Sequence, residues 1–496
     1  MTGDRIAEAS ESERSPAPEK KTGVFVTGSI LRHVIVMTVT GAVGLIAVFA
    51  VDFANLFYIS QLGEQELAAA IGFASILNFF TISISIGVTI GLGALVARAL
   101  GRGEEDLARR YATSGVIAAL GVGILVVLCA WPFLGTFLHW LGAEGRTHEI
   151  ALGYSRIVIP SFCFMTVGMA CSGVLRAVGD AKRAMYITLF GGLILLVLDP
   201  IFIFVLGLGV DGAAIASFLS RIAIAAVGLH GAARIHGLLE RPSPKHLPGD
   251  TVALARIALP AILTNLATPV GGAYVTAAMA AYGDAAVAGF AITERIVPVA
   301  FGFFFAMSGA VGPIVGQNYG AGQFDRVRQT LTDSLRIIGV YGLVVWLILF
   351  LVQDIVVTMF DASGLAADLI RLFCTFIAPT WMVLGALYVS NAAFNNLGYP
   401  FLSTAFNWGR ATLGTMPFVW IGSELGGAYG VAIGYAAGSV LFGALAIVTA
   451  FRVAGRLSQV PEGAHPPAWA IALAPRGSAA AAGFGLASAA DEDRRR

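Results

Sequence analysis

The chain has 496 residues, of which 57% are hydrophobic and only 12% are charged, and its mean hydropathy is +0.81. Soluble domains carry about 25% charged residues, so the composition excludes an ordinary soluble protein and predicts a polytopic membrane protein. The net charge of +1 gives no indication of nucleic-acid binding. All four cysteines fall in apolar runs, where we expect small buried side chains rather than disulfides or metal ligands.

The chain begins and ends with segments that are poor in bulky apolar residues. We expect residues 1–30 and 453–496 to be disordered cytoplasmic tails. Between them, mostly apolar runs of about 20 residues or more predict membrane-spanning helices, because that length crosses about 30 Å of hydrocarbon. The twelve expected spans are 33–59, 67–97, 111–137, 151–176, 184–206, 212–232, 252–281, 286–315, 332–357, 366–394, 400–422 and 427–451.

The two halves of the chain resemble each other, which predicts an internal duplication. Three segments return in the same order at offsets of 217–220 residues, beginning at Leu62 and Tyr282, at Val96 and Val315, and at Leu208 and Leu425. Six spans are an even number, so both halves are expected to insert the same way up, related by an axis along the membrane normal. The predicted fold is therefore all-α, with two pseudo-symmetric six-helix lobes at 31–232 and 251–452 joined by a cytoplasmic linker at 233–250.

The basic residues of the loops predict the orientation of the chain. Lys and Arg gather in alternate loops, including those at Arg98–Arg110 and Arg234–Lys245. The other loops are mostly acidic or neutral, as at Glu64–Glu66 and Asp284. The positive-inside rule then places both termini in the cytoplasm.

The run Ile194–Phe204 carries one carboxylate, Asp199, and one helix breaker, Pro200, among bulky apolar side chains. A charged Asp at the centre of a membrane helix costs about 2.5–3.5 kcal/mol, so such residues are rare and commonly functional. Pro200 also removes one backbone hydrogen bond of the helix. We therefore interpret Asp199 as a cation or proton site, with a packed polar residue as the alternative.

Asp52 lies at the depth expected for Asp199. Each of these acids precedes the estimated outer end of its span by seven residues, which places both about 10 Å below the outer surface. Two carboxylates at one depth in one lobe predict a shared site. The alternative for Asp52 is a hydrogen bond to a neighbouring helix.

Three further polar residues are candidates for contact with a substrate or a cavity. Glu294 opens the eighth span and is expected either to face a substrate cleft or to form an interhelical hydrogen bond. Arg221 lies about 15 Å into the sixth span, as a counter-charge, a cavity-lining cation or a structural partner. Asn391, near the end of the tenth span, is expected to line a cavity, or to pack or cap a helix end near the cytoplasm.

Four motifs carry a resemblance to a known family. They are Ala50-Val-Asp52 followed by Leu62-Gly63, Leu175-Arg-Ala-Val-Gly-Asp180, Leu198-Asp-Pro200 and Gly316-Gln-Asn-Tyr-Gly-Ala321. Over about Leu31–Arg452 the chain resembles the MATE (multidrug and toxic compound extrusion) transporters, which have twelve helices in two lobes. The third motif resembles the branch that includes the DNA-damage-inducible F-type and archaeal proteins.

This resemblance implies roles for specific residues. That branch has acids in its first and fifth helices, which correspond to Asp52 and Asp199 as the coupling residues. It usually has an Asn one turn before the fifth-helix acid, where this chain has Leu195. Because sodium favours several oxygen ligands, the departure favours protons over sodium as the coupling ion.

The resemblance implies a secondary antiporter of the bacterial cytoplasmic membrane. We expect it to export amphipathic, often cationic organic compounds through a partly aromatic cleft between the lobes, in exchange for protons or sodium. The expected partners are small organic substrates and the bilayer, without nucleic acid, cofactor or metal site, and we expect a monomer.

Other classes of membrane protein are weaker alternatives. A flippase for a lipid-linked precursor is the nearest, but such proteins are expected to line the cleft with many cations, and these spans supply few. The sequence contains no Walker A, HExxH or GxSxG pattern, so nothing indicates ATP hydrolysis or an intramembrane enzyme. A channel is disfavoured by the two-lobe duplication.

Overall fold

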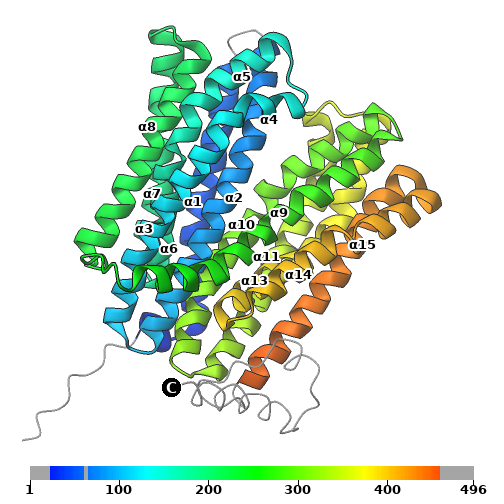
Figure 1. Cartoon of the computed structure of the whole chain (residues 1–496). Coiled ribbons are helices and arrows are strands. Elements are labelled where there is room, and N and C mark those ends of the chain that lie inside the picture. The colour runs from blue at the N-terminus through cyan, green and yellow to red at the C-terminus, as the bar shows by residue number, and fades with distance from the viewer. Residues whose placement is uncertain (1–22, 61–64, 458–496) are drawn as a thin grey trace, which may run out of the picture.

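The computed structural model describes residues 23–60 and 65–457, and all regular elements in that part of the chain are helices (Figure 1). The elements are η1 (Val24–Val26), α1 (Ile30–Ser60), α2 (Gln65–Gly101), α3 (Glu105–Ala130), η2 (Trp131–Phe133), α4 (Leu134–Trp140), α5 (Gly145–Val158), η3 (Ile159–Ser161), α6 (Phe162–Ala177), α7 (Ala181–Pro200), η4 (Ile201–Val205), α8 (Gly209–Leu229), η5 (His230–Ile235), α9 (Leu247–Ala280), α10 (Asp284–Gly320), α11 (Phe324–Met359), α12 (Gly364–Leu372), η6 (Phe373–Ile377), η7 (Ala378–Thr380), α13 (Trp381–Leu397), α14 (Pro400–Ala411) and α15 (Met416–Leu457).

Eleven helical segments within the described ranges are long and apolar enough to cross a membrane. The last of them, Pro400–Leu457, has 58 residues and holds two of the twelve predicted spans. Its helix α15 is broken at Gly426 and at Gly427, which has φ 57° and ψ −139°. The membrane-spanning helical architecture predicted from the sequence is confirmed, and the two counts differ only in this last segment.

The segment before this break, from Gly414 into the first part of α15, packs against the part of α15 after the break through glycines. A Cβ at Gly438 would lie 1.4 Å from the carbonyl oxygen of Gly414, and one at Gly430 would lie 1.8 Å from that of Gly422. These pairs are centred on position 426, so the two arms run antiparallel as a hairpin. Small residues let backbones approach this closely, which is how helices commonly associate in lipid.

The helices form two bundles that meet at one end and diverge toward the other (Figure 1). The described chain starts and finishes at the end where the bundles meet, which we call the termini-side end. The first helix of each lobe packs partly into the opposite lobe. Ile30 and Val34 of α1 belong to the hydrophobic cluster of the C-lobe, while Leu254 and Ala258 of α9 belong to that of the N-lobe.

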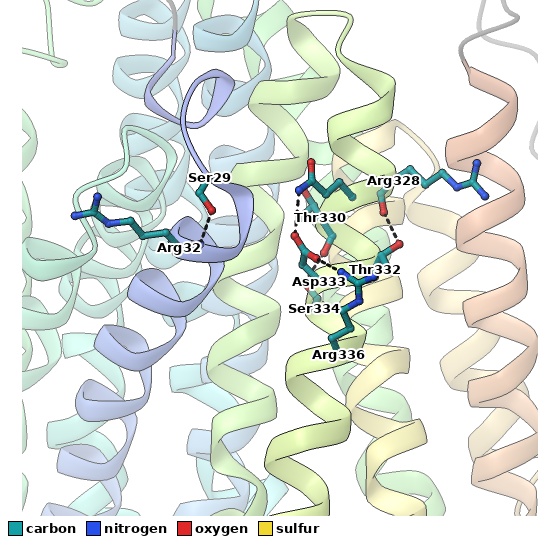
Figure 2. A network of polar contacts seen from close by, with 9 residues as sticks. Ser29, Arg32, Arg328, Thr330, Thr332, Asp333, Ser334 and Arg336 are labelled. Carbon is teal, nitrogen blue, oxygen red and sulfur yellow. Dashed lines mark hydrogen bonds and ion pairs between the residues drawn. The ribbon is translucent and has the colours of Figure 1, made fainter.

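The outer surface of the bundles is apolar. Large side chains such as Val205, Val340 and Leu351 are exposed on it, although residues of this kind fill the interior of soluble proteins. Figure 2 shows one of the polar clusters, on the first turns of α11, where buried Asp333 accepts hydrogen bonds from Gln329 (3.4 Å) and Arg336 (3.1 Å). The apolar surface is the one a bilayer covers.

Residues 23–29 correct the predicted extent of the N-terminal tail. The sequence interpretation placed them in a disordered segment, but they form η1 and a turn that pack onto the ends of α10 and α11. Phe25 is only 2% exposed, and its backbone N–H donates to Gln317 Oε1 at 2.8 Å. The side chain of Arg326 donates to the carbonyl oxygen of Phe25 at 2.9 Å. Buried polar partners fix this segment although its sequence is short and polar at both ends.

The predicted linker at 233–250 is attached to the N-lobe. The backbone N–H of Glu240 donates to Thr113 Oγ1 at 2.9 Å, and His236 Nε2 lies 2.8 Å from Asp180 Oδ2. Asp180 also caps α7, because it accepts the backbone N–H of Arg183 at 3.0 Å. Burial raises the pKa of Asp180, but its hydrogen bonds from Arg183 and His236 outweigh this effect and hold the pKa below its usual value.

Candidate functional site

The helix that carries Asp199 changes its geometry directly after it. The chain stays helical through Pro200, with φ −63° and ψ −32°, and then forms the π-helix η4, in which Leu206 N–H donates to the Ile201 carbonyl at 2.9 Å. Proline has no backbone N–H, so one hydrogen bond of the regular α-helix is missing here. Isolated π-helical turns are common at functional sites.

Asp199 is buried, with 1% of its surface exposed, and has one identified hydrogen-bond partner. Asn55 Nδ2, on α1, donates to Asp199 Oδ2 at 2.7 Å. The other carboxyl oxygen, Oδ1, is buried and has no hydrogen-bond partner among the described residues. Burying a charged oxygen without a hydrogen-bond partner costs free energy. A proton or a small cation bound at Oδ1 would reduce this cost.

Sequence reasoning did not identify Asn55. The family's usual Asn one turn before the acid is replaced by Leu195 in this chain. The side-chain amide of Asn55, on α1, contacts Asp199 instead. The signal was present, since Asn55 follows Asp52 by three residues and therefore lies on the same helix face. The side chain of Asp52 itself lies outside the described residues, so a site shared by the two acids remains a prediction.

Arg221 is buried in the N-lobe and forms three hydrogen bonds there. Its guanidinium donates to the Val158 carbonyl at 3.2 Å, to Ser161 Oγ at 3.2 Å and to Asn78 Oδ1 at 3.0 Å. All three acceptors are neutral, and only 9% of the residue is exposed. These bonds join α8 to α2 and to the bend between α5 and α6, so the geometry favours the structural alternative for Arg221.

A pocket lies inside the C-lobe, with about 610 Å³ of space free of protein atoms, including the part open to solvent. Four aromatic side chains and one carboxylate, that of Glu294, are among its lining residues. The lining consists of Met279, Phe290, Thr293, Glu294, Leu369, Phe373, Ile377, Thr380, Trp381, Leu384, Ala432, Tyr435, Ala436 and Ser439. The sequence interpretation expected a partly aromatic cleft between the lobes, whereas all residues of this pocket belong to one lobe.

Glu294 is exposed to the pocket and is accompanied by a buried cation. Arg410, on α14, is 1% exposed and interacts electrostatically with Glu294 and with Tyr388. Arg410 Nη2 also donates to Thr268 Oγ1 at 3.2 Å. Arg410 itself is not among the lining residues named above, so Glu294 is the one charged side chain among them, and the aromatic side chains beside it suit a flat organic molecule.

The remaining predicted residue, Asn391, lies on α13 and is 8% exposed. Its backbone carbonyl accepts a hydrogen bond from Ser403 Oγ at 3.2 Å, which connects α13 to α14. Asn391 is not among the residues that line the C-lobe pocket. The structure thus assigns Asp199 and Asn55 to one lobe and Glu294 to the other, and it does not bring these two groups together.

Known proteins resemble this chain in both sequence and fold. A FAD transporter from Shewanella oneidensis is 26% identical over 437 residues, covering 86% of this chain and 96% of that protein. The multidrug export protein MepA of Staphylococcus aureus is 23% identical over 355 residues, covering 70% of this chain and 75% of MepA. The solved structure of a MOP superfamily transporter from Pyrococcus furiosus superposes with a TM-score of 0.82 at 20% identity, covering 89% of this chain and 99% of that one.

The family follows from a match that spans both lobes. The MatE family model matches residues 42–201, which include Asp199, and residues 260–421, which include Glu294. This match confirms the family resemblance inferred from the motifs of the sequence, and the structural likeness confirms the fold. The chain therefore belongs to the MatE family of membrane transporters.

Proposed function

We propose that this transporter is an antiporter that exports amphipathic, often cationic organic compounds in exchange for protons. The observation that carries the proposal is Asp199, a buried carboxyl group in an apolar membrane helix, with one oxygen hydrogen-bonded to Asn55 and the other unpartnered among the described residues. Such a group changes its charge, and therefore its interaction with α1, when a proton arrives. The multidrug export function of MepA supports the proposed substrate class.

A proton suits this site better than sodium. Sodium requires several oxygen ligands, whereas Asp199 has an amide donor as its identified partner and Leu195 one turn earlier on α7. Protonation removes the charge and weakens the charge-assisted bond from Asn55, which changes the preferred packing of α1 against α7. A ligand shifts a conformational equilibrium only through its different affinity for the two states, and this change supplies such a difference.

The orientation of the protein belongs to the same proposal. With both termini in the cytoplasm of a bacterial cell, the diverging ends of the two bundles face outward. The chain contains both lobes, so we propose that it acts as a monomer without a cofactor. Substrate is proposed to bind at the aromatic pocket beside Glu294.

The decisive test is transport by the purified full-length protein in liposomes. Ethidium export is measured under a pH gradient alone and then under a sodium gradient alone. We expect export under the pH gradient. Transport of FAD instead of ethidium would favour the activity named for the Shewanella relative, and movement of a lipid-linked precursor would favour a flippase. Either result without ethidium export would overturn the proposal.

Glu294→Gln is expected to weaken ethidium binding about tenfold, which corresponds to about 1.4 kcal/mol. The reason is that the change removes the negative charge from an aromatic pocket but keeps the size of the side chain. Fluorescence titration of the detergent-solubilised protein measures the affinity. Glu424→Gln, which changes an exposed carboxylate outside the pocket lining, is the matched control. Equal affinities for the two variants would remove Glu294 from the substrate site.

A further inference from the structure

Among the hydrogen bonds of the described residues that join the lobes at the termini-side end, two are equivalent to each other. Arg98 Nη2, near the end of α2 in the N-lobe, donates to the Asn395 carbonyl in the last turn of α13 at 2.9 Å. Gln317 Nε2, near the end of α10 in the C-lobe, donates to the Ala177 carbonyl in the last turn of α6 at 2.7 Å. Each lobe thus caps a helix end of the other.

The internal repeat relates these two bonds. Gln317 follows Arg98 by 219 residues, within the range of offsets that relates the two halves. The two accepting helices are also equivalent, because α6 is followed by Gly179 with φ 90° and α13 ends at Gly398 with φ 92°, again 219 residues apart. These two hydrogen bonds between the lobes are therefore related by the pseudo-two-fold symmetry of the protein.

Two equivalent glycines bring the helices that carry these donors into contact. A Cβ at Gly101 would lie 2.1 Å from the Gln317 carbonyl oxygen, and one at Gly320 would lie 2.2 Å from the Arg98 carbonyl oxygen. Gly101 and Gly320 are also 219 residues apart. The ends of α2 and α10 therefore touch backbone to backbone, and this contact holds Arg98 and Gln317 within reach of the opposite lobe.

One half of this arrangement has an additional component. Gln317 is 0% exposed, and its Oε1 accepts the backbone N–H of Phe25 at 2.8 Å while its Nε2 holds Ala177. The Phe25 ring also reaches the N-lobe, since its Cζ would lie 3.4 Å from a Cβ at Gly179. Residues 23–29 thus fix the amide of Gln317 in the orientation that joins the lobes.

We propose that Arg98 and Gln317 form a symmetric latch that holds the termini-side end of the transporter closed, and that residues 23–29 strengthen its Gln317 half. The latch is a positioning device, since neither residue lines the C-lobe pocket. An alternating-access cycle must break both hydrogen bonds to open this end. The inference concerns a conformational equilibrium, so it stands or falls separately from the identity of the substrate and the coupling ion.

The test measures the separation of the lobes with two spin labels, by double electron–electron resonance. Labels at Lys182→Cys on α7 and Arg328→Cys on α11 report on the termini-side end, and both positions are exposed and outside the latch. Figure 2 shows Arg328. The four native cysteines are replaced by alanine. Arg98→Met and Gln317→Met keep the bulk of the side chains but remove the donors. We expect each to raise the fraction of widely separated labels about fivefold, and the double variant to raise it further.

Two controls and one deletion complete the experiment. Arg102→Met removes an exposed arginine of the same segment whose ion pair, with Glu104 at 2.9 Å, stays within the N-lobe, so it should leave the distances unchanged. Gln329→Met is the corresponding glutamine control. Deletion of residues 2–27 should open the termini-side end less than Gln317→Met, because the Ala177 bond remains. If the label distances in folded Arg98→Met and Gln317→Met proteins equal those of the parent, the proposed latch is wrong. The two single variants are sufficient for this conclusion even if the double variant does not fold.

Discussion

Asp199→Asn is expected to abolish export driven by a pH gradient, down to the level of liposomes without protein. The substitution keeps the size of the side chain and its contact with Asn55, but it fixes the group in an uncharged form. A site that cannot gain or lose a charge has no differential affinity for the proton, so it cannot shift the packing of α1 against α7. Because the variant removes a buried charge, we expect it to fold at least as well as the parent.

The measurement is ethidium export from proteoliposomes, with bound ethidium titrated separately. Asp211→Asn is the matched control, since Asp211 is an exposed carboxylate on the first turn of α8 in the same lobe. The control should export at the parental rate. Substrate binding by Asp199→Asn should persist, because the C-lobe pocket is untouched. Parental export by Asp199→Asn would show that this carboxyl group does not carry the coupling proton.

Gly438→Ala is expected to be the most destabilising small substitution in the C-lobe. The new methyl group would lie 1.4 Å from the carbonyl oxygen of Gly414, and backbone cannot move aside as a flexible side chain does. Overpacking of this kind costs about 3 kcal/mol or more, and it would separate the two arms of the glycine-packed hairpin that is centred on Gly426. The thermal unfolding midpoint of the protein in detergent, together with its yield, measures the effect.

Gly339→Ala provides the matched control. Gly339 lies in the interior of α11, and a Cβ there would have no neighbouring atom within 4 Å. Replacing an unhindered helical glycine by alanine is favourable by roughly 0.5–1 kcal/mol, so this variant should be as stable as the parent or slightly more stable. If the two variants had equal midpoints, the close contact at Gly438 would not contribute to the stability of the C-lobe.

The membrane helices and the duplication followed from the sequence because their signals are local or periodic. Long apolar runs specify spans by themselves, and the repeat at Val96 and Val315 is visible as shared letters. Asp199 could be identified for a similar reason, since a carboxylate within a long apolar run is visible in the sequence and costs free energy to insert into a membrane. The structure then confirmed its burial.

The contacts between distant segments did not follow from the sequence. Asn55 reaches Asp199 across 144 positions of the chain, and Phe25 reaches Gln317 across 292. Such partners depend on how helices pack, and a polar residue near a span end has the same local signature whether it caps a helix or joins two lobes. The C-lobe pocket was missed for the same reason, because its lining comes from helices that are separate in the sequence.

The exchange of the first helices between the lobes has a consequence for biogenesis. The termini-side half of α1, with Ile30 and Val34, has its partners in α10, which ends at Gly320. At the usual rate of translation, this apolar surface of α1 stays without its partner for on the order of tens of seconds, until α10 has been synthesised. The N-lobe also lacks Leu254 and Ala258 until α9 is inserted. Each half thus completes its helix packing only when the other half is inserted, and a nascent chain that stalls in the linker exposes two incomplete helix interfaces to the insertion and quality-control machinery of the membrane.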